Sequence, residues 1–260
     1  MNMQLGHTEA LAPAARIAYA PAPRQGLVGV GLAAGVIAGW ITLHVAGVFA
    51  LPGAVALALS PVLVAVQCWL SVGLFIIAHD AMHGSLAPRR PGVNRFFGRV
   101  AVMVYACIWY DGLVQRHFMH HRASGTAGDP DFHEQGDTSF WRWYGSFMTE
   151  YLTVAQLAGL VLFSSAQLAL GVELWRLLTF WALPAILSSL QLFYFGTYLP
   201  HRRESEAGFV DGHHARSNGY PWLVSLLTCF HFGYHHEHHL APTAPWWRLP
   251  HVRAALRARA

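Results

Sequence analysis

The order of apolar and polar positions divides this chain into four long apolar runs joined by more polar segments. No Asp, Glu, Arg or Lys occurs in residues 27–51, 54–78, 151–172 or 177–200. A helix needs about 20 apolar residues to cross the hydrocarbon layer of a membrane. Core helices of large soluble proteins can also be apolar on every side, but they rarely stay uncharged over such lengths. The pattern therefore predicts four transmembrane helices.

The lengths of the links between these runs predict how the helices are arranged. Runs one and two are separated by only a few residues, as are runs three and four, so we expect two helical hairpins. We expect residues 79–150 and the segment after residue 200 to form a helical cap on one side of the membrane. Residues 1–25 are rich in Pro and Ala and predict a flexible tail, with residues 26–260 as a single domain. The predicted fold class is an all-α, integral membrane helical bundle.

Charged residues are sparse, and their distribution predicts an orientation. They make up 12% of the chain, against about 25% in soluble domains. All 17 basic residues are Arg, and all except Arg176 lie before the first run, between runs two and three, or after the fourth run. Since cytoplasmic segments carry the excess of basic residues, we expect both termini and the middle segment to be cytoplasmic. The net charge of +4 then indicates attraction to anionic lipids and not to nucleic acid.

Histidine forms a second pattern, because the chain has 17 and most of them lie in three clusters. Residues 79–83 have the spacing H-x-x-x-H, while residues 117–121 and 235–239 share the spacing H-x-x-H-H. Positions i, i+3 and i+4 lie on one face of a helix, so the imidazoles of each cluster can converge on a metal ion. The eight candidate ligands are His79, His83, His117, His120, His121, His235, His238 and His239.

The ligand type narrows the choice of metal. Imidazoles with no cysteine nearby suit iron or zinc, and none of Cys68, Cys107 and Cys229 lies in a histidine cluster. A structural zinc ion takes four ligands, so eight or more imidazoles indicate two metal ions. The spacing alone leaves the choice between iron and zinc open.

Other polar residues are candidates for a ninth ligand or for contacts that orient the ligands. His201 ends the fourth apolar run at the same predicted level as His79, and we expect it to bind metal as well. A metal-bound imidazole usually donates its second ring N–H to a carboxylate or a carbonyl. The candidate neighbours are Asp80, Asp129, Asp131, Glu134, Asp211, Glu237, His213, His214, His231 and His236. For each of the acidic residues, a role as an exposed charge in a loop is as compatible with the sequence as contact with a ligand.

The context of these clusters resembles bacterial carotenoid ketolases of the β-carotene 4-ketolase type, which belong to the membrane fatty acid desaturase family. The similar stretches are HDAMHGSLAP from His79, HFMHHRASGTAGDPDFH from His117, LTFWALPAILSSLQLFYFGTYLPHR up to Arg202, and HHARSNGYPWLVSLLTCFHFGYHHEHHLAPTAPWWRLP from His213. The resemblance implies a non-haem di-iron centre held by the eight ligands and His201, with no catalytic residue beyond the metal centre. Thr197 stands where related desaturases place an Asn, and is therefore expected next to the irons.

The resemblance also implies an activity. The C4 methylene of a β-ionone ring is converted to a ketone by two hydroxylations and the loss of water, which turns β-carotene into echinenone and canthaxanthin. O₂ is the co-substrate, and the carotenoid enters from the lipid bilayer. Electrons are expected from a ferredoxin and its reductase, because the sequence has no nucleotide, flavin or iron–sulfur motif. The expected location is the bacterial inner membrane, with the metal site on the cytoplasmic side.

Three other classes of function are compatible with these motifs. A carotenoid hydroxylase or a fatty-acyl desaturase would use the same metal centre with a different pocket. A zinc-dependent membrane hydrolase would need no oxygen, and a non-catalytic metal-binding or transport protein would leave cellular carotenoids unchanged.

Overall fold

The computed structural model describes residues 16–133, 139–202 and 208–259. Within these ranges every regular element is a helix, and strand-like pairing is limited to an isolated bridge between Ser217 and Tyr234. The all-α prediction is therefore confirmed. Of the predicted N-terminal tail, residues 1–15 lie outside the described residues, and residues 16–24 precede the first helix without regular structure.

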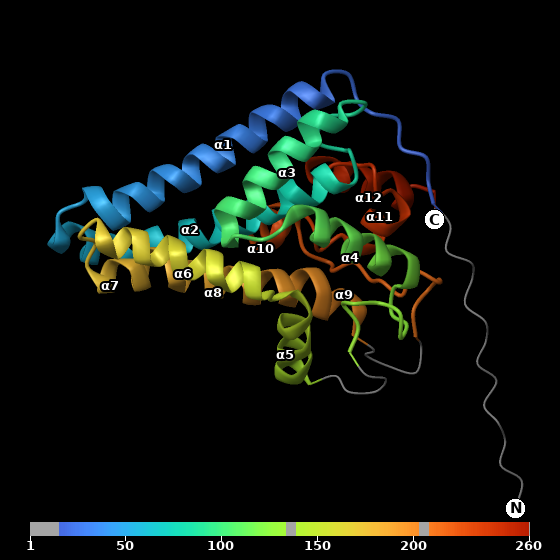
Figure 1. Cartoon of the computed structure of the whole chain (residues 1–260). Coiled ribbons are helices and arrows are strands. Elements are labelled where there is room, and N and C mark those ends of the chain that lie inside the picture. Colours follow the sequence, from blue (N-terminus) through green and yellow to red (C-terminus); the bar gives the residue numbers. More distant parts are fainter. Residues whose placement is uncertain (1–15, 134–138, 203–207, 260) are drawn as a thin grey trace, which may run out of the picture.

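The first two apolar runs form a helical hairpin (Figure 1). α1 (Gln25–Val45) continues through the π-helical turn η1 (Ala46–Ala50), and α2 (Gly53–Met82) returns in the opposite direction. α2 has 30 residues, so at 1.5 Å per residue it is about 45 Å long, whereas the hydrocarbon layer is about 30 Å thick. Its last turn, which carries His79, can therefore extend beyond that layer.

A sharp bend between α3 and α4 brings the second histidine cluster toward the end of α2. α3 (Pro91–Ala106) packs along α2, and Cys107 ends it in the left-handed region with φ of 54°. α4 (Tyr110–Ala123) then leaves at 100° to α3. Gly98 is needed at this corner, because an added Cβ would lie 2.3 Å from the ring of Tyr110.

The third and fourth apolar runs differ in how far they extend as helices. α5 (Phe140–Tyr151) and α6 (Val154–Ala169) meet at 87°. With 16 residues, α6 is about 24 Å long. The predicted span 151–172 therefore corresponds to a shorter helix, and it qualifies as a span only together with α5.

The fourth run forms a continuous helical rod over residues 174–201. Its segments are α7 (Leu174–Leu177), η2 (Leu178–Ala182), α8 (Leu183–Leu192), η3 (Phe193–Tyr198) and α9 (Leu199–His201). In the described part of the chain, three helices are long and apolar enough to cross a membrane, or up to five if each bent pair is one span. The three are residues 25–50, 53–82 and 174–201.

The C-terminal helices pack on α2 near its histidine-bearing end (Figure 1). They are α10 (Trp222–Cys229), α11 (His235–Leu240), η4 (Trp246–Arg248) and α12 (Leu249–Arg257). Between α10 and α11, the ring of Phe230 stacks on Trp69 of α2 with 4.4 Å between ring centroids. Gly73 makes this approach possible, because a Cβ there would lie 2.7 Å from the same ring. The third histidine cluster is thereby held against α2.

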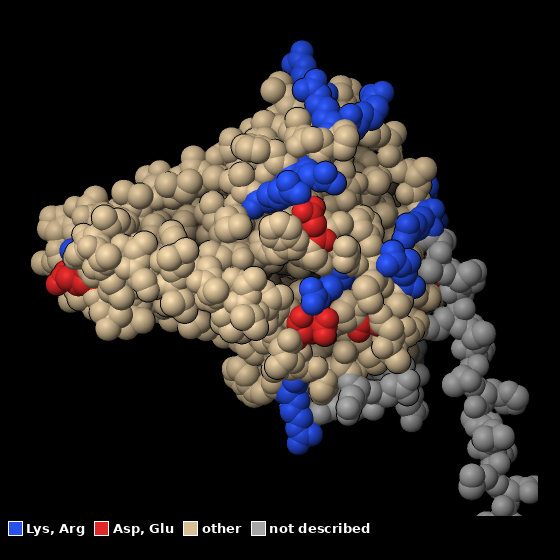
Figure 2. Space-filling view, in the orientation of Figure 1, with Lys and Arg blue, Asp and Glu red and all other residues tan. Residues whose placement is uncertain are grey.

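The surface separates into a charged end and an apolar body. Figure 2 shows acidic and basic side chains gathered over the end that contains α4, whereas the long part formed by α1, α6 and α8 is uncharged apart from a small group at its far tip. Large apolar side chains are exposed along that body, among them Leu27, Leu162 and Ile186. Apolar surface of this extent is stable in contact with lipid and not with water. The chain therefore has the surface of a membrane protein.

The far tip of the bundle is held together by Arg176 of α7. Its guanidinium donates hydrogen bonds of 2.9 Å to the carbonyl oxygens of Gly47 and Leu51, which end the first helix. It also donates to the carboxylate of Glu173 at 3.2 Å. Because the last carbonyls of a helix have no partner within that helix, Arg176 supplies the donors that they lack.

We predict that Arg176→Met lowers the free energy of unfolding by about 2–3 kcal/mol, because charge-assisted hydrogen bonds to two helix-end carbonyls are lost. Denaturant titration in detergent micelles measures the effect. Arg99→Met is the matched control, because its ion pair with Asp111 leaves the Arg99 side chain 52% exposed, and such a pair contributes about 0–1 kcal/mol. Equal losses in the two variants would contradict the anchoring role of Arg176.

Candidate metal centre

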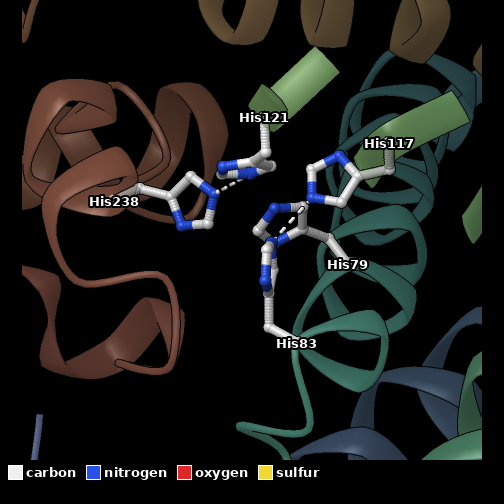
Figure 3. A group of neighbouring side chains, drawn as sticks. All are labelled: His79, His83, His117, His121 and His238. Atoms are coloured by element: carbon white, nitrogen blue, oxygen red, sulfur yellow. Dashed lines mark hydrogen bonds between the residues drawn. The ribbon is translucent and has the colours of Figure 1, made fainter. Parts of the chain in front are cut away.

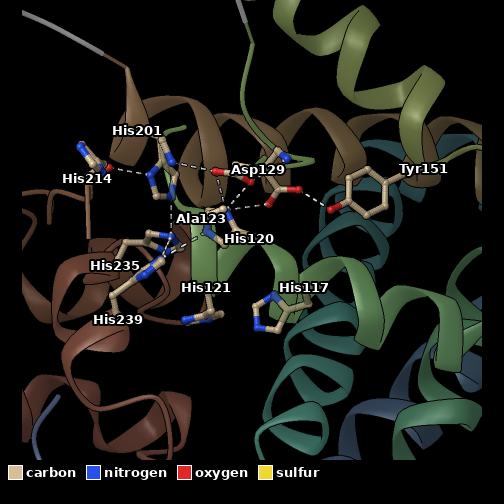
Figure 4. Close-up of polar contacts among 12 residues, drawn as sticks. His117, His120, His121, Ala123, Asp129, Tyr151, His201, His214, His235 and His239 are labelled. Carbon is tan, nitrogen blue, oxygen red and sulfur yellow. Dashed lines mark hydrogen bonds and ion pairs between the residues drawn. The ribbon is translucent and has the colours of Figure 1, made fainter. Parts of the chain in front are cut away.

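All nine histidines predicted to bind metal lie together near the end of α2, although they come from four separate stretches of the chain. They form two groups, and within each group the candidate ligand atoms all lie within 4.8 Å of one another. Group one consists of His79, His83, His117, His121 and His238 (Figure 3), and group two consists of His120, His201, His235 and His239 (Figure 4).

Both H-x-x-H-H clusters divide between the two groups in the same way. On α4, His117 and His121 belong to group one and His120 to group two; on α11, His235 and His239 belong to group two and His238 to group one. At 100° per residue, positions i and i+4 differ by about 40° around a helix, whereas i+3 and i+4 differ by about 100°. Each of these helices therefore lies between the two groups and contributes to both.

Contacts between ring nitrogens have the spacing expected of metal ligands. In group one, the Nε2 atoms of His83 and His117 are 2.7 Å apart, and in group two the Nε2 atoms of His201 and His235 are 2.9 Å apart. Metal–imidazole bonds of about 2.0–2.1 Å place neighbouring nitrogens about 2.9–3.4 Å apart in octahedral or tetrahedral geometry. The observed distances are close to this range.

Hydrogen bonds among the imidazoles cannot satisfy all of these nitrogens. Nε2 of His235 approaches Nε2 of both His201 and His239, the latter at 3.1 Å. A neutral imidazole nitrogen has either one hydrogen or one lone pair, so it can satisfy only one such neighbour. In the buried His79 ring, neither nitrogen has a hydrogen-bond partner within the described chain. A metal ion in each group would use these lone pairs together.

The environment also favours the form of imidazole that binds metal. Burial lowers the pKa of His235, His238 and His239 well below the usual value for histidine, and the neighbouring imidazoles lower it further. These three rings are therefore neutral at pH 7, as metal ligation requires. The residues present thus fit two metal ions, one held by each group.

A carboxylate orients one of the group-two ligands. Nδ1 of His120 donates to the carboxylate of Asp129, with distances of 2.9 and 3.0 Å to its two oxygens (Figure 4). The backbone N–H groups of Gly125 and Asp131 also donate to this carboxylate, both at 2.9 Å. Burial raises the pKa of Asp129, but the hydrogen bonds from His120 and Gly125 outweigh burial and bring it below its usual value. The carboxylate leaves Nε2 of His120 free to face group two.

A second acid, Asp131, lies beside this contact. Its carboxyl group is 3.6 Å from Nδ1 of His120 and accepts a hydrogen bond from the hydroxyl of Tyr151. Burial raises the pKa of Asp131, and the adjacent charge of Asp129 raises it further. Sequence reasoning missed Tyr151 as a site residue, since it is the first residue of the third apolar run and belongs to no histidine cluster.

Three further predicted neighbours lie next to the ligands. Nδ1 of His201 donates to the backbone carbonyl of His214 at 2.7 Å, so His214 contributes its main chain and not its imidazole. The buried ring of His213 lies 5.6 Å from that of His239. Thr197 is buried one helical turn before His201.

Other predicted neighbours have partners away from the ligand nitrogens. Asp80 accepts from the backbone N–H of Trp246 at 3.1 Å, and its carboxylate is 3.8 Å from Nδ1 of His79. The remaining side chains have other partners: His236 pairs with Asp211, Glu237 with Ser217 and Arg253, and His231 packs among Trp222, Tyr234 and Trp246. Glu134 lies outside the described residues.

One aromatic residue joins the two groups without being a ligand. The ring of Phe232 lies 4.5 Å from that of His79 in group one and 4.8 Å from that of His235 in group two. Its position between α10 and α11 has no periodic pattern that would have identified it in the sequence. Phe232 therefore packs against a ligand of each group.

A cavity of about 460 Å³ borders both groups and extends away from them between the helices. His79 and His117 of group one and His120 and His235 of group two line one part of it. The remaining lining is largely apolar and aromatic, and comes mainly from α5, α6, α8 and η3. The cavity therefore suits an apolar molecule that presents one of its atoms to both groups.

The cavity reaches the lipid-facing surface between α6 and α8. Val161 of α6 and Ile186 of α8 both line it, and they are 65% and 57% exposed. α6 contacts α1 and η2 toward its C-terminal end, where Gln167 bonds to His44 at 2.9 Å and Phe163 packs 5.1 Å from Trp181. An apolar molecule dissolved in the membrane can therefore enter sideways.

The sequence profile of the fatty acid desaturase family matches residues 52–170 and 151–260. The chain belongs to the fatty acid desaturase family. Within it, the chain is 47% identical over 229 residues to a beta-carotene ketolase from Paracoccus sp. (strain PC1), which covers 87% of this chain and 93% of that protein. A beta-carotene ketolase from Paracoccus sp. (strain N81106 / MBIC 01143) is 48% identical over 225 residues, or 84% of this chain and 89% of that protein.

An algal relative extends the comparison. The zeaxanthin 4-ketolase of Chlamydomonas reinhardtii is 38% identical over 254 residues, which are 93% of this chain and 56% of that protein. These comparisons confirm the resemblance inferred from the sequence. As a member of the desaturase family, the chain combines histidine clusters fit for a metal centre with apolar helices.

We predict that Asp129→Asn weakens metal binding by group two roughly 10–100-fold, because an amide no longer fixes the tautomer and orientation of His120. Competition between the protein and a chelator of known affinity measures the change. Asp111→Asn is the control, since Asp111 pairs with Arg99 on the surface. Equal affinities for wild type and Asp129→Asn would contradict this role.

Proposed function

We propose that this chain is an oxygen-dependent carotenoid ketolase with two iron ions. It would convert the C4 methylene of a β-ionone ring to a ketone, and so turn β-carotene into echinenone and canthaxanthin. The observation that carries the proposal is the apolar cavity lined by imidazoles from both histidine groups. The names of the relatives in the desaturase family support the choice of substrate.

The overall reaction balances with O₂ and an external one-electron carrier. In the first round, the methylene, O₂, two electrons and two protons give the C4 alcohol and one water. A second round on the same carbon gives a geminal diol and another water, and the diol loses water to form the ketone. Bound iron would supply the activation of O₂, with five ligands available from group one and four from group two.

The protein's own residues position the ring and keep water away. The apolar lining of the cavity orients a hydrocarbon ring against His79, His117, His120 and His235. Phe232 packs against the rings of His79 and His235, and Asp129 keeps Nε2 of His120 directed at group two. The C4 hydrogens of the ring are allylic and therefore the weakest C–H bonds that the cavity presents to the metals.

The proposed setting is the inner membrane of a bacterium, with the metal centre on the cytoplasmic side. Both histidine groups lie at the charged end of the molecule, and the excess of Arg at that end favours a cytoplasmic position. A ferredoxin with its reductase is the proposed electron donor, because the sequence has no motif for a nucleotide, flavin or iron–sulfur cofactor. The exposed Arg side chains favour docking of an acidic carrier.

Expression in a β-carotene-producing bacterium tests the function. We expect keto-carotenoids in pigment chromatography and about two iron ions per purified chain, as two histidine groups require. His120→Ala should abolish the ketone while the protein stays in the membrane, and the control His251→Ala, at an exposed position, should leave it intact.

Other outcomes of this experiment identify the alternatives. A product that stops at the alcohol would indicate a carotenoid hydroxylase, and new double bonds in fatty acids would indicate a desaturase. Full activity in protein that contains zinc and no iron would contradict the proposal.

The lateral opening of the cavity gives a further prediction. Val161→Trp should lower ketone formation roughly 10-fold or more, because an indole ring there obstructs entry of the carotenoid and displaces it from the metals. The control is Leu162→Trp, since Leu162 is 72% exposed and does not line the cavity, and its effect should stay within about 2-fold. Ketone yields normalised to membrane protein and iron content are the measurement. Equal losses in both variants would argue against entry between α6 and α8.

A further inference from the structure

Gln156 is a buried polar side chain in the wall of the cavity. It lies near the start of α6, is 7% exposed and lines the cavity. Its backbone N–H donates to the Thr153 hydroxyl at 3.2 Å, but within the described residues its carboxamide makes no hydrogen bond, and the amide atoms are not completely buried.

The other buried glutamines behave differently. Gln25 donates to the carbonyl of Ser85 at 2.7 Å, and Gln167 pairs with His44 at 2.9 Å. Gln67 donates to the carbonyl of Trp40 at 3.3 Å, although its Oε1 has no partner within the described residues. The rule for buried amides is that they have a partner. An unpaired carboxamide in the wall of a largely apolar cavity therefore indicates that its partner comes from the molecule in the cavity.

Gln156 lies in the first turn of α6, at the end of this helix that is nearer to Tyr151 in the chain. Gln156, Leu160 and Ser164 follow one another at four-residue spacing along α6 and all line the cavity. Leu152, in the break between α5 and α6, lines the cavity as well. Tyr151, the residue before Leu152, reaches Asp131 beside His120.

Several other polar groups that line the cavity already have partners in the protein. The hydroxyls of Tyr144 and Ser189 are 2.7 Å apart, and the hydroxyl of Tyr151 donates to Asp131. Because these hydroxyl groups are already paired, they have little capacity left to hydrogen-bond a molecule in the cavity. A carboxamide, in contrast, offers two donors and an acceptor.

The starting hydrocarbon has no oxygen to bind this amide, whereas the alcohol formed in the first round has one. We propose that Gln156 is a specificity-determining residue that hydrogen-bonds the C4 hydroxyl of the half-oxidised ring and holds it for the second round. This inference rests on the proposed ketolase function. Release of the alcohol then competes with its second oxidation, and the hydrogen bond slows release.

The product ratio of Gln156→Leu tests this role. A single hydrogen bond corresponds to about a 3- to 10-fold change in an equilibrium or dissociation rate, so the ratio of C4 alcohol to ketone should rise by about that factor. With purified C4 alcohol as substrate, kcat/KM relative to that for β-carotene should fall by a similar factor. Gln156→Met repeats the test with a side chain of closer length, should the leucine variant fold poorly.

Gln167→Leu is the matched control. It makes the same chemical change in the same helix, but Gln167 bonds to His44 and does not line the cavity. It should lower stability and leave the alcohol-to-ketone ratio at the wild-type value.

The outcomes separate this inference from the proposed function. Suppose that wild type forms ketone, and that the Gln156 variants have normal iron content and the wild-type ratio of C4 alcohol to ketone. The proposed role of Gln156 is then wrong, and the ketolase function stands. If wild type forms no oxygenated carotenoid, the function itself is wrong and the inference falls with it.

Discussion

Nine imidazoles lie side by side in a space from which water is largely excluded, and the rest of the structure depends on how their nitrogens are satisfied. Neutral imidazoles cannot satisfy one another in the observed arrangement, because several Nε2 atoms converge without enough hydrogens to share. A shared positive ion in each group would resolve this conflict. Metal binding would then be coupled to the folding of the histidine-bearing end, since the candidate ligands lie on α2, α4, α9 and α11 or directly after α2.

The surrounding helices hold those four stretches at one level. α2 is long enough to carry His79 past the apolar layer, and Gly73 allows Phe230 to pack closely on α2. The bend after Cys107 turns α4 toward the same end of the bundle. Each feature is local, yet together they bring ligands more than 100 positions apart in sequence within reach of one metal ion.

The cavity links this centre to the membrane. Its lining is largely apolar and aromatic, and histidines of both groups line one part of it. An apolar wall favours entry from lipid, and the few polar groups in the lining could distinguish the substrates of successive steps of the proposed reaction.

Much of this protein could be predicted from its sequence, because apolar runs and histidine spacings are local patterns. They indicated an all-helical membrane protein and all nine histidines that converge in the structure. Local patterns cannot specify how far a helix extends or where it bends, so the short α6 and the right-angled α5 were not foreseen.

The division of the histidines between two groups was also decided only by tertiary structure. Spacing places positions i, i+3 and i+4 on one face of α4, but whether they serve one metal or two depends on the helices packed on either side of that face. For the same reason Asp129, and not Asp80 or Glu237, orients a ligand. A carboxylate can act on an imidazole only within hydrogen-bonding distance, and that distance is set by contacts between segments remote in the chain.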